Sequence, residues 1–281
     1  LRAGEVRRAG ALLADLSRTL DVLDFGPSDP RRGQALLLDV RLAAKAGDTA
    51  RFDAASAGAL ELAALHGWDD ISVYLIYEVA CRQRQLGRLD DAADGLEAVL
   101  GWATERKEND LMAQCLAEQA ELALERGEAT RARGLLQRCL GVYDKQGEGL
   151  LAGQALLRLS EITARLGEPR EAEEYLDLAA DLLARWGSRV GAADVARGRA
   201  RAQAVRDHLD VALEHQRNAV SRYRSLGAPA LAEALIELGE LHLQNGQKEE
   251  AVTALKAALL HLDEGGGELQ DRAQQRLHVA T

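Results

Sequence analysis

The stretch ACRQRQLGRLDDAADGLEAV at residues 80–99 decides the fold, because its pattern returns forty residues later as AELALERGEATRARGLLQRC at 120–139. A glycine stands near the middle of each stretch, and the same interval holds along most of the chain. The series consists of Gly47, Gly87, Gly127 and Gly167, followed by Asp207 at the next step and Gly246 one residue early. A fixed period of about 20–50 residues is typical of a solenoid, in which one supersecondary unit is stacked repeatedly.

Small residues accompany the turn position in each unit. Five residues after it come Ala92, Ala132, Ala172, Ala212 and Ala251, and twelve residues before these come Ala80, Ala120, Ser160, Ala200 and Gly239. Small side chains at matched places allow two successive helices to approach closely. Larger apolar residues, such as Leu96 and Val99, follow at the spacing of one helix face.

The turn residue predicts the end of a first helix, because glycine adopts the left-handed C-cap conformation at low cost and aspartate is a tolerable substitute. A second series of breaks, which predicts the end of a second helix, consists of Gly67, Gly147, Gly187, Gly227 and Gly265. Near position 107 the polar run Glu105–Asp110 takes the place of such a glycine. Apolar and polar residues do not alternate with period two. Each unit is therefore predicted to be two helices of roughly sixteen residues, and the chain to be all-α.

These patterns predict one domain, residues 1–281, without internal boundaries. Its expected parts are an N-terminal helix (Val6–Phe25) and a break within 1–30, about six helix–turn–helix repeats over 31–267, and a C-terminal helix (Glu268–Val279) within 268–281. The last helix follows the glycines at 265–267 and is expected to cap the array. Since the first residue is leucine, we expect the chain to be part of a longer polypeptide.

Composition limits the classes of function. The net charge of −10 argues against a nucleic-acid partner, and no apolar run reaches the roughly eighteen residues of a membrane-spanning helix. Cys81, Cys115 and Cys139 have no paired spacing, which predicts free thiols, in the core for the last two and alternatively in a groove for Cys81. We therefore expect a cytoplasmic protein, and the excess of arginine over lysine suggests a bacterial source.

The sequence lacks the patterns of common catalytic and cofactor sites. No phosphate-binding or dinucleotide-binding glycine motif is present. His208 and His215 lie two helical turns apart, but no acidic or cysteine ligand stands at the usual metal-binding interval. Acidic pairs such as Glu173-Glu174 fall at second-helix starts, where carboxylates favour the helix dipole. We therefore predict no enzymatic activity, no metal and no cofactor.

The repeat resembles the tetratricopeptide repeat family over about residues 30–265. The matching positions are the small Ala80, the Leu86-Gly87 turn, Ala92 and the Leu96/Val99 pair, with their counterparts in the other units. The unit is longer than the family's usual length of about 34 residues. The family's late proline is replaced, for example by Thr104. Such long units are similar to those of bacterial signalling proteins and of the sensor arms of large regulatory ATPases. The resemblance implies a right-handed α-α superhelix.

In this family the first helix of each pair lines a concave groove, so the resemblance implies a row of partner-binding residues. Carried over by register, the row contains Arg41, Tyr74, Tyr77, Arg84, Gln114, Glu121, Gln154, Glu161, Arg197 and Arg201, and in the last unit Glu233, Ile236 and Glu240. Tyr74 and Tyr77 offer rigid contact area with a polar tip, the alternative being that one of them packs between repeats. The groove asparagines with which many family members grip a peptide backbone are absent from these positions.

The fifth unit is rich in arginine. Residues 189–224 contain eight arginines and four acidic residues, a local excess of four positive charges in an acidic chain. One interpretation is a seat for an acidic peptide or a carboxylate, since arginine binds carboxylates through two hydrogen bonds. The other interpretation is that these arginines pair with Glu161, Glu233 and Glu240 on adjoining helices.

We therefore expect a protein-interaction scaffold that holds a segment of another protein or peptide, or of its own parent chain, in the groove. The alternative is the sensor arm of a larger signalling ATPase or transcription regulator that binds a small effector or a short peptide. A third hypothesis is an array that assembles through its terminal repeats, so a homo-oligomer is compatible with the sequence.

Overall fold

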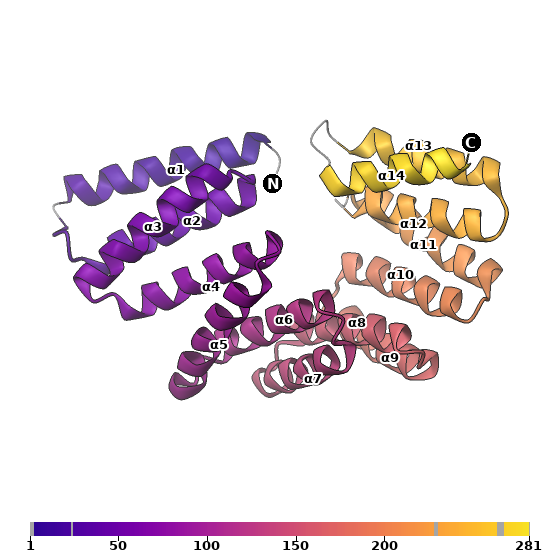
Figure 1. Cartoon of the computed structure of the whole chain (residues 1–281), viewed down its shortest axis with the longest axis horizontal. Coiled ribbons are helices and arrows are strands. Elements are labelled where there is room, and N and C mark those ends of the chain that lie inside the picture. Colours follow the sequence, from indigo (N-terminus) through magenta and orange to yellow (C-terminus); the bar gives the residue numbers. More distant parts are fainter. Residues whose placement is uncertain (1–2, 24, 228–229, 263–266, 281) are drawn as a thin grey trace. The chain divides into compact units, whose positions relative to one another are not determined.

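The computed structural model describes residues 3–23, 25–227, 230–262 and 267–280, which form fourteen helices and no strand (Figure 1). The chain divides into two compact units, Leu1–Leu122 and Ala123–Thr281, which we call unit 1 and unit 2. Unit 1 contains α1 (Ala3–Val22), α2 (Pro30–Ala46), α3 (Thr49–His66), α4 (Asp69–Gln85), α5 (Leu89–Arg106) and most of α6 (Asn109–Glu125). Unit 2 contains α7 (Ala129–Gln146), α8 (Gly149–Arg165), α9 (Pro169–Arg185), α10 (Arg189–Val205), α11 (Leu209–Leu226), α12 (Leu231–Gln244), α13 (Lys248–His261) and α14 (Gly267–Ala280).

The predicted all-α repeat is confirmed. First helices (α2, α4, α6, α8, α10 and α12) alternate with second helices (α3, α5, α7, α9, α11 and α13), and those from α2 to α11 have 17 or 18 residues. Among the described residues, no helix combines the length and the apolar character needed to cross a bilayer. The expectation of one continuous array over 1–281 stays a prediction.

The forty-residue turn positions are left-handed, as the glycine series predicts. Gly87 and Gly127 have φ values of 75° and 77°, and Asp207 has a φ of 61°. The break expected near position 107 is formed by Lys107, whose φ is 60°. A side chain with a Cβ makes this conformation costly. The surrounding helices therefore impose the turn geometry at both positions even though no glycine is present.

The small residues of the repeat are buried contact points between helices. Ala92, Ala132, Ala172, Ala212 and Ala251 are 0% exposed, and Ala80, Ala120, Ser160, Ala200 and Gly239 are also buried. A Cβ added at Gly239 would lie 2.7 Å from the Cγ of Leu255. The predicted role of these positions in close helix packing is thus confirmed.

Each unit has its own apolar core. In unit 1, Val40, Phe52 and Leu75 are at most 2% exposed and belong to one cluster. Trp68 joins this cluster and donates its indole N–H to the carbonyl of Ser28 at 2.9 Å. The core of unit 2 between α10 and α14 is built around the fully buried side chains of Tyr223, Ile236 and Leu255.

The ends of the predicted elements shift by a few residues. Helix α1 ends at Val22, before the predicted Phe25, and the predicted break ends where Pro30 opens α2 behind its N-cap, Asp29. Proline at this position replaces an N–H that the helix leaves unpaired in any case. Helix α14 matches the predicted C-terminal helix, and the expected break at Gly265 lies outside the described residues.

Candidate partner-binding site

Unit 2 contains a cavity of about 830 Å³ lined mainly by its first helices α8, α10 and α12. Six of the predicted groove residues contribute to its wall: Gln154, Glu161, Arg197, Arg201, Glu233 and Glu240. One arginine of α14, Arg272, completes the lining. The predicted register therefore gathers polar side chains from three successive repeats within this unit.

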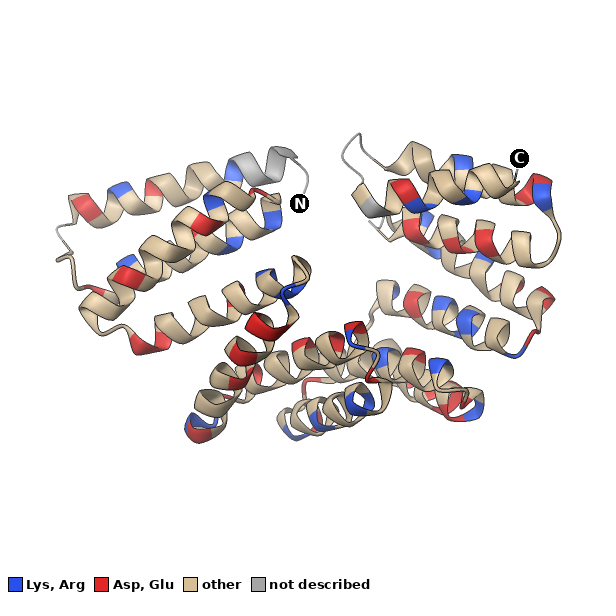
Figure 2. Cartoon of the chain, viewed as in Figure 1, with Lys and Arg blue, Asp and Glu red and all other residues tan. Residues whose placement is uncertain are grey.

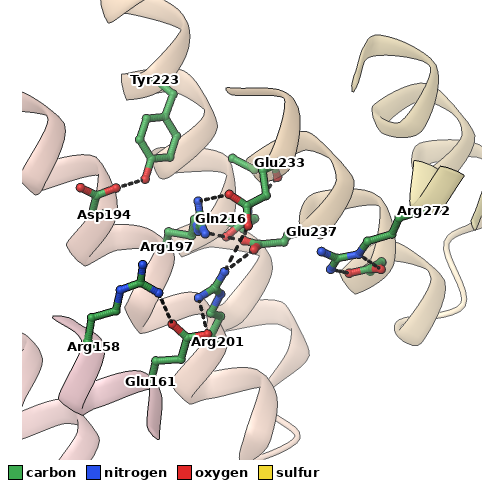
Figure 3. A network of polar contacts seen from close by, with 12 residues as sticks. Arg158, Glu161, Asp194, Arg197, Arg201, Gln216, Tyr223, Glu233, Glu237 and Arg272 are labelled. Carbon is green, nitrogen blue, oxygen red and sulfur yellow. Dashed lines mark hydrogen bonds and ion pairs between the residues drawn. The ribbon is translucent and has the colours of Figure 1, made fainter. Parts of the chain in front are cut away.

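A network of ion pairs crosses the cavity (Figure 3). Arg201 of α10 lies 3.1 Å from the carboxylate of Glu161 on α8 and also contacts Glu237 on α12. Arg197 lies 3.0 Å from Glu233 and 3.3 Å from Glu237. Each of these two arginines thus joins α10 to α12, and Arg201 also joins it to α8.

Two partly buried members of the network, Glu161 and Arg201, have pKa values shifted in favour of their charged forms. Burial disfavours the charged form of Glu161, but the neighbouring guanidinium groups, Arg201 first, outweigh it and lower the pKa of this carboxyl group. For Arg201, burial is likewise outweighed by the carboxylates of Glu237 and Glu161, which raise the pKa of the guanidinium. The opposite charges therefore stabilise one another in a partly desolvated site.

Gln216 is the polar residue beneath this network. It belongs to the second helix α11, is 0% exposed, and donates its amide to the carbonyl of Ala234 at 2.8 Å and to Glu237 at 3.2 Å. Its Oε1 has no hydrogen-bond partner among the described residues. Nearby, the Tyr223 hydroxyl donates to Asp194, and burial followed by this hydrogen bond raises the pKa of the tyrosine.

Sequence reasoning missed two of these residues. Glu237 lies next to Ile236, which the register placed in the groove; that placement is wrong, because Ile236 is fully buried in the core. Gln216 lies on a second helix, outside the elements expected to line a groove. The sequence signalled Gln216 only as an exception in the repeat pattern. The other repeats after the first have leucine at this register position, namely Leu96, Leu136, Leu176 and Leu255.

The second interpretation holds for Arg197 and Arg201, the two arginines of the arginine-rich repeat that line the cavity. Glu161 and Glu233 pair with its arginines, whereas Glu240 instead accepts hydrogen bonds from Arg272, at 3.0 and 2.6 Å, and from Arg276. The cavity lining contains as many basic as acidic residues: Arg158, Arg165, Arg197, Arg201 and Arg272 against Glu161, Asp194, Glu233, Glu237 and Glu240. The excess of basic residues in this repeat, part of which is visible as blue segments along α10 in Figure 2, is therefore balanced among the residues that line the cavity.

Apart from the buried Ile236, the other six predicted residues belong to unit 1, where Arg41, Tyr74 and Arg84 make contacts between repeats. Arg41 lies 2.6 Å from Glu78 and over the ring of Tyr74, 5.8 Å from its centroid. Arg84 lies 3.0 Å from Glu118. Tyr77 is only 9% exposed, as expected if one tyrosine packs between repeats, and burial raises its pKa.

Gln114 and Glu121 complete the unit 1 set. Gln114 is exposed on α6, and Glu121 is partly buried on the same helix. Of the predicted cysteines, Cys115 and Cys139 are buried free thiols, and Cys81 is a partly buried one. The core assignment of Cys115 and Cys139 is therefore confirmed.

Comparison with known proteins supports the repeat. The tetratricopeptide repeat model matches residues 232–260, which include most of α12 and α13. No curated protein matches the chain. Among solved structures, a Rap protein complexed with competence and sporulation factor has a TM-score of 0.73 and 13% identity, covering 99% of this chain and 76% of its own.

Two further solved structures are similar in fold. Aspartyl phosphate phosphatase F from Bacillus subtilis has a TM-score of 0.69 and 14% identity, covering 84% of this chain and 61% of its own. A signal transduction ATPase with a tetratricopeptide repeat sensor, PH0952 from Pyrococcus horikoshii, has a TM-score of 0.60 and 17% identity, covering 90% and 37%. The matched repeat and the shared fold confirm the resemblance of this chain to the tetratricopeptide repeat family.

Proposed function

We propose that this chain is a non-catalytic protein-interaction scaffold that binds a segment of a protein or peptide partner in the groove of its first helices. The observation that carries the proposal is the unit 2 cavity of about 830 Å³, where side chains of three repeats converge. The fold neighbour in complex with competence and sporulation factor supports binding as the use of such a surface. The partner is a protein or peptide, or another domain of the parent chain.

The chemistry of the cavity favours recognition over catalysis. The carboxylates of Glu161 and Glu240 are held by arginines, and their pKa values are lowered, so neither is suited to donate a proton near neutral pH. Arginines and carboxylates offer directional hydrogen bonds to a polypeptide. The net charge of −10 disfavours nucleic acid, and we place the protein in the bacterial cytoplasm, with self-association a further use of its surface.

The sensor arm of a larger signalling protein is the second candidate. It is supported by the similarity to the signal transduction ATPase from Pyrococcus horikoshii, which has a tetratricopeptide repeat sensor and of which this chain covers 37%. In that role the cavity would bind a small effector or a short peptide. A thermal shift of several degrees with a protein-free metabolite extract would favour the sensor over the scaffold.

The scaffold is tested by capture from lysate of the source organism with three baits. These are the unchanged chain, the double variant Arg158→Ala/Arg165→Ala in the cavity wall, and the control Arg170→Ala. Arg170 is an exposed arginine of α9 outside the cavity lining. We expect a protein retained by the unchanged chain and by the control but lost from the double variant. Equal recovery by all three baits would contradict binding in the cavity.

Tyr77 and Arg201 are less suited to this test. Tyr77 is buried and Arg201 joins three helices, so alanine at either position removes contacts that hold repeats together. Arg158 and Arg165 are the better choice because 58% and 61% of their side-chain surfaces are exposed.

A further inference from the structure

The walls of the unit 2 cavity differ in charge. Its α8 wall presents Arg158 and Arg165, whose exposed guanidinium groups lie 3.9 and 2.8 Å from the carboxylate of Glu161 on the same helix. Among the described lining residues, the α12 wall presents Glu233, Glu237 and Glu240 and no basic residue, while α10 between the two walls carries Asp194, Arg197 and Arg201. A ligand in the cavity therefore meets a wall of net positive charge on one side and a wall of net negative charge on the other.

We propose that this cavity selects an extended polypeptide segment that carries charges of both signs. Its acidic side chain lies at the α8 wall, its basic side chain at the α12 wall, and a main-chain N–H donates to the Oε1 of Gln216. This inference rests on the proposed function and specifies the chemistry of the partner.

The existing ion pairs disfavour a ligand of a single sign. Arg197 and Arg201 are already paired with carboxylates, and Glu237, with only 10% of its side chain exposed, depends on both of them. A purely acidic ligand that drew Arg201 away would leave Glu161 and Glu237 with less compensation. Removing one partner from a buried ion pair is strongly unfavourable. When the anionic group of a segment with both signs draws an arginine away from a carboxylate, a cationic group of the same segment takes the place of that arginine.

Gln216 supplies the second observation. Its orientation is fixed, because a rotated amide would place Oε1 against the carbonyl of Ala234 and the carboxylate of Glu237. Within the described part of the chain, no donor reaches the remaining oxygen, which is a buried acceptor in a residue that lines the cavity. Buried acceptors are nearly always paired. An extended segment offers main-chain N–H groups of the required kind, which become available to this oxygen once the ligand rearranges the ion pairs above it.

The test uses three fluorescent synthetic peptides of equal length and equal number of charged residues. One carries a glutamate block and a lysine block, one only glutamate and one only lysine. Fluorescence anisotropy with the full chain is expected to show the mixed peptide binding about tenfold more tightly than either of the others. Tighter binding of a single-sign peptide would overturn the selection for both signs while leaving peptide binding intact. Absence of saturable binding for all three would count against both proposals.

Two variants locate the binding. Arg158→Ala/Arg165→Ala is expected to weaken the mixed peptide several-fold, whereas the control Arg170→Ala leaves its affinity unchanged. Gln216→Leu restores the leucine found at this register in neighbouring repeats and should fold, and it is expected to weaken the same peptide. Unchanged affinity in Gln216→Leu, with a melting temperature no lower than that of the unchanged chain, would remove Gln216 from the site.

Discussion

The two units contain the same inter-repeat ion pair in different surroundings. Arg41 and Glu78 pair in unit 1, and four repeat steps later Arg201 and Glu237 pair in unit 2. The first pair is flanked by Tyr74, whereas in the second Arg201 also reaches Glu161 and Glu237 also reaches Arg197. The same contact between repeats is therefore part of a larger ion-pair network in unit 2 but not in unit 1.

A register position on the second helix also differs between the two places. Ser56 in unit 1 and Gln216 in unit 2 stand at the register position where the repeats between them have leucine. The Ser56 hydroxyl donates to the carbonyl of Asp53 in its own helix, so it does not reach the next repeat. The longer Gln216 bonds both the backbone and the carboxylate of the next first helix. The carboxylate of the unit 2 ion pair is thus hydrogen-bonded by a side chain of the second helix, whereas Ser56 bonds within its own helix.

The largest expected effect comes from removing the two equivalent carboxylates. Arg197, Arg201 and the Gln216 amide all contact the Glu237 carboxylate, which Glu237→Ala removes. The free energy of unfolding should therefore fall by about 3–5 kcal/mol. Glu78→Ala breaks a pair whose arginine is 38% exposed and should cost no more than about 1 kcal/mol. Urea unfolding followed by circular dichroism measures both values.

Equal losses in the two variants would contradict the comparison. They would mean that the network in unit 2 contributes nothing beyond its isolated pair. Glu97→Ala, on α5 and exposed, is a suitable control for the general effect of losing a carboxylate.

The repeat and its turns were predictable because they depend on local requirements. Glycine at a left-handed turn and alanine at a helix contact are each imposed by sterics, and Asp207 was recognisable as a substitute from its place in the series. The cavity was only partly predictable. Arg197 and Arg201 could be placed on a groove face, and their pairing with Glu161 and Glu233 was one of two interpretations. Choosing between the two required distances between repeats that no periodicity encodes. Gln216 was visible only as an interruption of a leucine series.

The two left-handed turns without glycine offer a smaller, matched test of the units. Lys107→Gly in unit 1 and Asp207→Gly in unit 2 should each raise the free energy of unfolding by about 1 kcal/mol, because a Cβ is disfavoured at φ of 60° and 61°.

The buried thiols report on each unit separately. Burial raises the pKa of Cys115 to about 12 and that of Cys139 to about 11, so both react slowly with thiol reagents while folded.

Labelling rates then distinguish the units. Lys107→Gly is expected to slow the labelling of Cys115, and Asp207→Gly that of Cys139. Gly127→Ala, which puts a Cβ at a φ of 77°, should act in the opposite direction and lower stability. No change in either rate would show that these turns are not strained.

The smallest expected effect is the acid dependence of the unit 2 network. Because neighbouring arginines lower the pKa of Glu161 below its ordinary value of 4.5, the folded state holds this carboxylate ionised more firmly than the unfolded state does. The resulting stability is present in full above that ordinary value and is lost as the pH falls through the lower pKa of the folded state. Glu161→Gln should therefore reduce the decline in unfolding free energy on acidification, as measured by urea unfolding across this range. An identical decline in Glu161→Gln and the unchanged chain would show that Arg201 does not stabilise the Glu161 carboxylate, and would leave Arg201 paired chiefly with α12.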